Sequence, residues 1–80
     1  MRDEQRDFLR KTILELLKDK QARYTELEKK VSATCKPWAT SNTFKSQLRY
    51  LVNSGCIKRI SRGIYSITFK GENYLVFLTR

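Results

Sequence analysis

Apolar residues recur at helical spacing near the start of the chain. The residues that share this stripe are Leu9, Ile13, Leu16 and Leu17, with Phe8 beside it. Charged residues, Arg10 among them, fall elsewhere on the helical wheel. A narrow apolar stripe on a polar segment is typical of an amphipathic helix that packs on a core. The pattern therefore predicts a helix over residues 3–20, followed by a link or a brief edge strand at residues 22–24.

Two capping patterns predict two further helices. In Thr25-Glu26-Leu27-Glu28 the threonine and Glu28 can cap each other's backbone N–H groups, so a short helix is expected from Thr25 to Val31 or Ser32. Residues 32–40 contain the single proline of the chain, which indicates a loop. Ser41-Asn42 is then expected to cap a helix that ends near Asn53. The predicted core face of this helix consists of Phe44, Leu48, Leu51 and Val52.

After Gly55, which can end a helix in the left-handed conformation, the pattern changes to alternation. β-Branched and aromatic residues at 56–60 and 64–68 predict a hairpin, with Gly63 at its turn. Thr68 is expected to cap a last helix that extends through Leu78. In the hairpin, the side chains expected to point inward are Ile57, Tyr65 and Ile67, and those expected to face water are Lys58, Arg62 and Ser66.

Charge is segregated along the chain. From Lys29 to Gly71 there are nine Lys or Arg residues and no Asp or Glu, although the whole chain of 80 residues contains eight acids against 17 bases. A net charge of +9 alone would say little, because many soluble domains are basic. The exclusion of acids from one continuous segment predicts a surface that meets a polyanion.

Composition narrows the class of protein. We expect residues 1–80 to form a single domain with a small core. The chain has no histidine, so the usual Ser-His and Cys-His catalytic pairs cannot be built, and we expect neither an enzyme nor a small-molecule substrate. Two cysteines without histidine exclude the usual zinc sites, and no metal or cofactor is expected. The chain lacks a membrane span and a secretion signal, which predicts a cytoplasmic protein with free thiols. A redox response of Cys35, in the predicted loop, stays open.

Four short patterns carry a resemblance to a known family. They are L-x-x-L-V-x-x-G from Leu48, C-I-K-R-I from Cys56, R-G-x-Y-x-I-T from Arg62 and T-x-K-G-x-x-Y-L from Thr68. These patterns resemble small prokaryotic, especially archaeal, winged helix-turn-helix DNA-binding proteins, and the similarity spans about residues 9–78. It implies an α+β fold with a three-helix core, a β-hairpin wing and a C-terminal fourth helix. The connection at 32–40 is longer than the usual helix-turn-helix turn.

The resemblance also implies which residues meet double-stranded DNA. The helix at 41–53 would lie in the major groove and the hairpin at 57–68 would approach the backbone or the minor groove. The residues carried over are Ser41, Asn42, Thr43, Lys45, Ser46 and Arg49 on the helix, and Lys58, Arg59 and Arg62 on the wing. The residue types fit these roles by themselves, since arginine can pair with a guanine edge, asparagine with adenine, and Ser, Thr and Lys with phosphate.

Several of these side chains also have an ordinary structural interpretation. Arg49, Lys45 and Lys58 could be solvated surface residues, and the stem of Arg59 could pack along the sheet. Tyr50 fits either stacking on nucleic acid or half-buried packing. Trp38 fits a lid over the core better than a nucleic-acid contact.

The last helix is apolar on all sides. A domain this small cannot bury every residue of Tyr74-Leu75-Val76-Phe77-Leu78, so either the helix end frays or a second copy covers it. We expect a homodimer through Tyr74, Val76, Phe77 and Leu78, which would favour inverted-repeat sites.

The sequence thus favours a DNA-binding transcriptional regulator of a prokaryote, or of a virus or plasmid of one. Two alternatives remain: a winged-helix module that binds a protein in a replication or transcription assembly, and a chromatin-type protein without sequence preference. RNA binding is less favoured, because no strand carries paired exposed aromatic residues.

Overall fold

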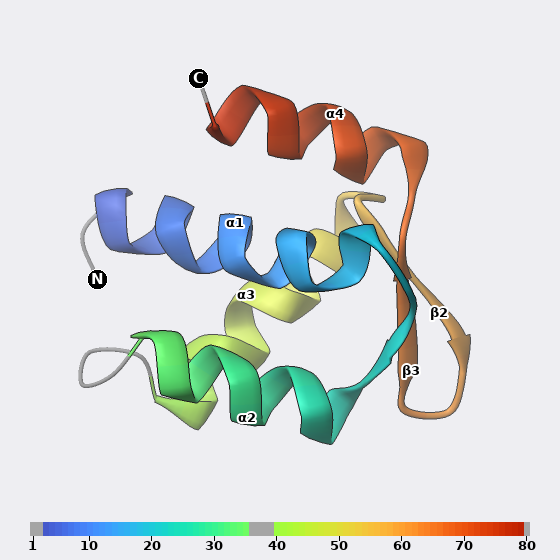
Figure 1. Ribbon diagram of the computed structural model, residues 1–80, viewed down its shortest axis with the longest axis horizontal. Coiled ribbons are helices and arrows are strands. Elements are labelled where there is room, and N and C mark those ends of the chain that lie inside the picture. Colours follow the sequence, from blue (N-terminus) through green and yellow to red (C-terminus); the bar gives the residue numbers. More distant parts are fainter. Residues whose placement is uncertain (1–2, 36–39, 80) are drawn as a thin grey trace.

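The computed structural model describes residues 3–35 and 40–79, with the side chains of Asp3, Cys35 and Ser41 left aside. Four helices and a three-stranded antiparallel sheet form an α+β fold (Figure 1). In chain order the elements are α1 (Asp3–Lys18), β1 (Ala22–Arg23), α2 (Tyr24–Cys35), α3 (Ser41–Asn53), β2 (Ile57–Ser61), β3 (Ile64–Ile67) and α4 (Phe69–Leu78). The predicted loop residues 36–39, including Trp38, lie outside the described residues, as do the side chains of Cys35 and Ser41.

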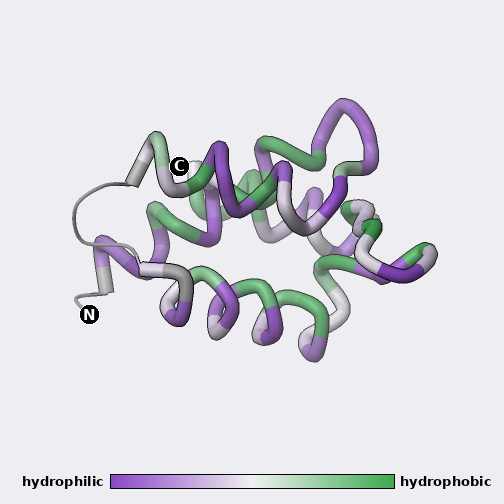
Figure 2. Tube along the Cα trace, turned by 90° about the horizontal axis from the view of Figure 1, so that it is seen from below, coloured by the Kyte–Doolittle hydropathy of each residue, from purple (hydrophilic) through white to green (hydrophobic). Residues whose placement is uncertain are grey.

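Helix α1 is the centre of the molecule. It lies between α4 and α2, with α3 behind it and the hairpin at one end (Figure 1). Hydrophobic and hydrophilic residues alternate along the helices with the turns of the backbone (Figure 2). The buried side chains form one cluster: Leu9, Ile13, Leu14, Leu17, Ala22, Leu27, Val31, Phe44, Leu48, Leu51, Cys56, Ile57 and Leu75. The predicted stripe is confirmed at Leu9, Ile13 and Leu17, but it missed Leu14, because α1 is covered by helices on several sides.

The predicted boundaries of α2 are wrong at both ends. The helix begins at Tyr24, so Thr25 lies inside its first turn instead of capping it. The reason lies outside the helix, since the Tyr24 N–H donates to the carbonyl oxygen of Gly63 at 2.8 Å, and strand β1 leads directly into α2. At its C-terminus the helix continues to Cys35. Residues 32–35 include no glycine or proline, and Pro37 disfavours the helical conformation only of the residue directly before it. Helix α1 ends at Lys18, two residues before the predicted end.

Helix α3 agrees with the prediction except at its cap. The N-cap is Thr40 instead of the Ser41-Asn42 pair, and its hydroxyl accepts from the Thr43 N–H at 3.2 Å. At the C-terminus Gly55 has a φ of 87°, as predicted. The Cys56 N–H donates to the Leu51 carbonyl at 2.9 Å and the Gly55 N–H to the Val52 carbonyl at 3.1 Å, the two bonds of a Schellman motif. This turn redirects the chain from α3 into β2.

The sheet has the strand order β1-β3-β2. Residues 22–23 pair with β3, so this segment is the predicted edge strand and not an unstructured link. The predicted hairpin is confirmed, with Gly63 at a φ of 75° and an irregularity between Arg59 and Ser61. Ile57 is buried as expected, whereas Ser66, expected in water, is half-buried like Tyr65 and Ile67.

Helix α4 is attached to the turn after α3. Thr68 is its N-cap, as predicted, and accepts from the Gly71 N–H at 3.1 Å. The same hydroxyl donates to the Gly55 carbonyl oxygen at 2.6 Å, and the Thr68 N–H donates to the Cys56 carbonyl oxygen at 3.0 Å. Within residues 3–35 and 40–79, no helix has the length and apolar character needed to cross a bilayer.

Candidate nucleic-acid interface

The outer face of α3 is polar and cationic. The side chains of Asn42, Lys45, Ser46 and Arg49 are exposed there, as predicted. Thr43 is half-buried, and its hydroxyl lies 3.0 Å from that of Thr40 within the helix cap. Its side chain therefore stabilises the start of the helix, which leaves it less free to bind a ligand than the sequence suggested.

A shallow groove of about 420 Å³ lies between α3 and the sheet. Three cations from two elements line it: Lys45 and Arg49, one turn apart on α3, and Arg59 of β2. Arg59 is opposite Tyr65 in the strand register and shares a sheet face with the buried Ile57, so it points toward α3. The other lining residues are Tyr24, Leu48, Val52 and Tyr65. Side chains from α2, α3, β2 and β3 thus meet in one positive, partly apolar groove.

The three cations have no ion pair or hydrogen bond among the described residues. The ion pairs found there join Arg6 to Asp7 and Lys30 to Glu26, away from the groove. Burial, and then the negative charge of Glu28, raise the pKa of the Tyr24 phenol, so this tyrosine stays neutral beside the groove. Unpaired cations around neutral walls leave a site with positive potential that an anion can neutralise.

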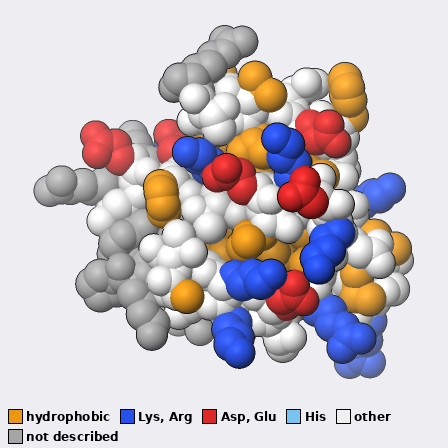
Figure 3. All heavy atoms as spheres, viewed as in Figure 1, with side chains coloured by type: hydrophobic (Ala, Val, Ile, Leu, Met, Phe, Trp, Pro, Cys, Tyr) orange, Lys and Arg blue, Asp and Glu red, His pale blue; other side chains and the backbone are white. Residues whose placement is uncertain are grey.

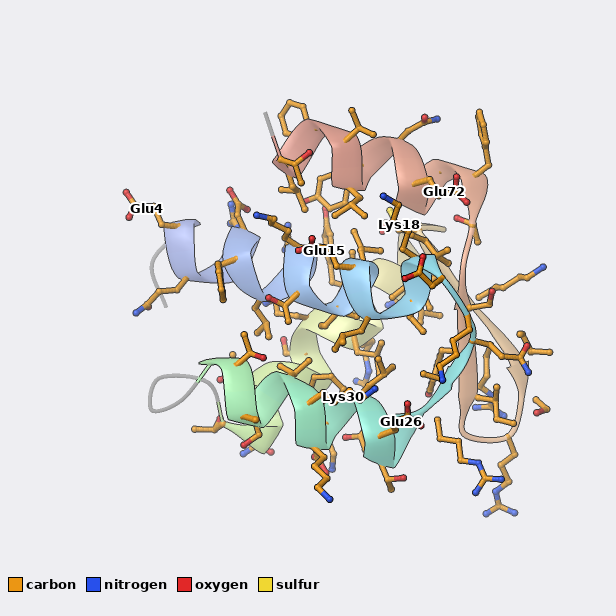
Figure 4. All side chains as sticks on the ribbon, viewed as in Figure 1. Glu4, Glu15, Lys18, Glu26, Lys30 and Glu72 are labelled. Atoms are coloured by element: carbon orange, nitrogen blue, oxygen red, sulfur yellow. The ribbon has the colours of Figure 1, made fainter. Side chains whose placement is uncertain are left out.

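No acidic side chain among the described residues lines the groove, although the charge of Glu28 reaches the Tyr24 phenol at its edge. The face of α1, α2 and α4 in Figure 3, with α3 behind it, carries acidic and basic side chains together, whereas basic ones gather alone over the end of the hairpin. Glu15 and Lys18 of α1 line one groove with Glu72 of α4, and Glu26 pairs with Lys30 along α2 (Figure 4). Among the described residues, the acids thus lie on or beside α1, α2 and α4, and none belongs to α3 or the hairpin.

The wing residues do not form one group. Arg62 is exposed at the hairpin turn and lines a separate hollow of about 310 Å³ with Arg23 of β1. Arg23 was missed from the sequence, because only the pairing of β1 with β3 brings it beside the turn. Lys58 is exposed, but it alternates with Ile57 and Arg59 along β2 and so faces away from α3. The structure therefore separates Lys58 from the groove.

The opposite flank of α3 contains a buried cation. Arg10 of α1 is only 8% exposed, so its predicted position away from the core is wrong. Its Nε donates to Gln47 Oε1 at 2.7 Å and its Nη1 donates to the Tyr74 hydroxyl at 3.1 Å. The guanidinium carbon lies 3.8 Å from the centroid of the Tyr50 ring. These neutral partners, from α3 and α4, make burial of the charge tolerable, which helical periodicity alone could not reveal.

Part of α4 is apolar and exposed. Val76 is 58% and Phe77 is 62% exposed, whereas Tyr74 and Leu78 are half-buried against the core. Phe69, at the start of the helix, is 79% exposed and was missed from the sequence. The helix is intact to Leu78, and the Thr79 N–H donates to the Leu75 carbonyl at 3.0 Å, so the alternative of a frayed end is wrong. The apolar residues are therefore presented on a formed helix.

Comparison with known proteins yields no relative. No family model, no curated protein and no solved structure matches the chain.

Proposed function

We propose that the protein binds double-stranded DNA as a winged helix-turn-helix domain, with α3 in the major groove and the β2–β3 hairpin as the wing. The observation that carries this proposal is the convergence of Lys45, Arg49 and Arg59, all without a partner among the described residues, on one groove beside the exposed face of α3. A DNA strand offers a row of phosphates that matches cations placed on two adjoining elements.

Each exposed side chain has a role set by its position. Asn42 and Arg49 are on the outer face of α3 and would contact base edges in the major groove. A bidentate contact from arginine or asparagine favours the correct base over a wrong one by about 1–3 kcal/mol. Lys45 and Arg59 would hold the backbone that follows the groove. Arg62, together with Arg23, would contact the next phosphates or the narrow minor groove at the hairpin turn.

A homodimer through α4 is part of this proposal. Val76 and Phe77 would be covered by the same residues of a second copy, with Tyr74 and Leu78 at the margin. The molecule measures 29 × 28 × 21 Å, and α4 lies at one end of the 28 Å axis (Figure 1). Two copies joined there would have their centres about 28 Å apart, near the roughly 34 Å between successive major grooves. Such a dimer would occupy inverted repeats and act as a transcriptional regulator by excluding or recruiting other proteins.

The exposed apolar part of α4 also supports a second function, docking to another protein within a replication or transcription assembly. Phe69, Val76 and Phe77 are the observation in its favour, since large exposed apolar side chains on a formed helix are typical of an interface. In that case the cationic groove would only keep the domain close to nucleic acid.

Fluorescence anisotropy with a labelled random duplex, repeated over a salt series, tests the first proposal. Four cations, Lys45, Arg59, Arg23 and Arg62, would neutralise about four phosphates per copy, so the slope of log affinity against log salt should be about −3.6 for each bound copy. Absence of binding at about 50 mM salt, where screening is weak, would refute it.

Two neighbouring residues offer a matched control. Arg59→Glu and Lys58→Glu change the net charge equally at adjacent positions on opposite faces of β2. We expect Arg59→Glu to reduce affinity at least tenfold more than Lys58→Glu, because only Arg59 lines the groove. Equal losses would mean that overall charge, not the groove, causes binding. The pair Arg49→Glu and Arg62→Glu should abolish DNA binding, and under the docking function it would leave partner binding intact.

A further inference from the structure

A helix in a major groove has a sugar-phosphate strand on each side. On the sheet side of α3, Lys45 and Arg49 line the groove with Arg59. The opposite side of the helix carries Thr43, Ser46 and Tyr50, and none of these is a cation. If α3 enters DNA, its own side chains would therefore offer the second strand neutral hydrogen-bonding groups.

Tyr50 is the largest of these groups and the most firmly held. Its ring is 46% exposed, and the Arg10 guanidinium covers one face at 3.8 Å from the centroid. Arg10 cannot move freely, because it donates to Gln47 Oε1 and to the Tyr74 hydroxyl from a site only 8% exposed. The hydroxyl of Tyr50 itself has no hydrogen-bond partner among the described residues. A fixed ring thus presents a free donor on the outer side of α3.

The charge behind the ring matters as well. Arg10 is a cation whose described partners are an amide, a phenol and an aromatic ring, so its charge is not cancelled locally. In a poorly solvated site this charge acts over a longer range than it would in water. It therefore favours an anion near the exposed edge of Tyr50.

We infer that Tyr50 donates a hydrogen bond to a DNA phosphate on the strand opposite the wing, and that Arg10 is the positioning residue that holds its ring. This inference rests on the proposed DNA binding. The competing explanation is structural: the ring of Tyr50 would merely cover a buried cation, and its hydroxyl would have no function.

Tyr50→Phe separates the two explanations, because it retains the ring over Arg10 and removes only the hydroxyl. We expect affinity for duplex DNA to fall about 5- to 10-fold, to the same degree for random and selected sequences. The slope against salt should stay unchanged, since no charge is removed. Equal affinity of Tyr50→Phe and wild type would overturn the inference while leaving the proposed function standing. A wild-type protein that binds no DNA would instead remove the proposed function.

A double-mutant cycle tests the role of Arg10. Gln47→Met removes one hydrogen bond from Arg10 at a position that is itself only 8% exposed, so the substituted side chain has little direct access to DNA. If Arg10 acts by holding Tyr50, Gln47→Met should weaken DNA binding in the wild type, but have little effect in the Tyr50→Phe background. Equal losses in both backgrounds, or no loss in either, would overturn the positioning role. Thermal unfolding of each variant verifies that the protein remains folded at the assay temperature.

Discussion

Replacing Gly71 by alanine should destabilise the protein strongly, although the same change in an open helix would stabilise it. Alanine is favoured over glycine inside a helix by about 1 kcal/mol. At Gly71, however, an added Cβ would lie 2.1 Å from the carbonyl oxygen of Cys56 and 2.9 Å from Ile67 Cγ1. Carbon–oxygen contacts in proteins are usually about 3.3 Å or longer, so α4 and the Cys56 backbone would have to separate by about 1 Å.

The attachment of α4 cannot accommodate such a shift without losing contacts. Thr68 bonds the Cys56 carbonyl through its N–H at 3.0 Å and the Gly55 carbonyl through its hydroxyl at 2.6 Å. Overpacking costs about 1–3 kcal/mol, and a lost hydrogen bond adds about 1 kcal/mol. We therefore expect Gly71→Ala to lower the free energy of unfolding by about 2–4 kcal/mol. In a domain of this size each kcal/mol lowers Tm by about 4–8 °C.

Urea and thermal unfolding followed by circular dichroism measure this loss. Gly63→Ala is the matched control, because nothing lies within 4 Å of its Cβ and only the positive φ of 75° opposes the change. Its expected loss is about 1–2 kcal/mol. A Gly71→Ala protein as stable as the wild type, or more stable, would show that the close approach of α4 to the Cys56 backbone is wrong.

Three further changes test other parts of the molecule. Val76→Lys combined with Phe77→Lys should convert the dimer to a monomer in a sedimentation experiment. Phe69→Lys, at the other end of α4, is the control and should leave the dimer intact. A wild-type protein that is monomeric at high micromolar concentration would contradict the proposed dimer. Thr68→Val should lower the free energy of unfolding by about 1–2 kcal/mol through loss of the cap, and an unchanged denaturation midpoint would contradict that role. Burial raises the pKa of the Tyr24 phenol above its usual 10.0, so with rising pH the unfolded chain loses this proton before the folded protein does. The contribution of the protonated phenol to the free energy of unfolding is therefore complete below pH 10 and is lost as the pH rises through the pKa of the folded state. Tyr24→Phe should therefore reduce the alkaline fall in stability, and an unaltered alkaline limb in urea titrations would contradict the shift.

Local chemistry made some features predictable from the sequence. Gly55, Gly63 and Thr68 were recognised correctly, because a positive φ or a cap depends on a few neighbouring residues. The core face of α3 was predicted for the same reason, since helical spacing alone brings Phe44, Leu48 and Leu51 together. The start of α2 was not predicted, because it depends on a hydrogen bond from Tyr24 to Gly63, 39 residues along the chain.

In the candidate site, too, features set by neighbouring residues were predictable and features set by distant residues were not. Residue order alone establishes that acids are absent from residues 29–71 and that Asn42, Lys45, Ser46 and Arg49 share one side of a helix. Folding brings Arg59 to Lys45 and Arg49, keeps Lys58 away from them, and places Arg23 beside Arg62. It also buries Arg10 under Tyr50. These placements depend on strand register and on helix packing across the core, where residues far apart in the chain compete for the same space.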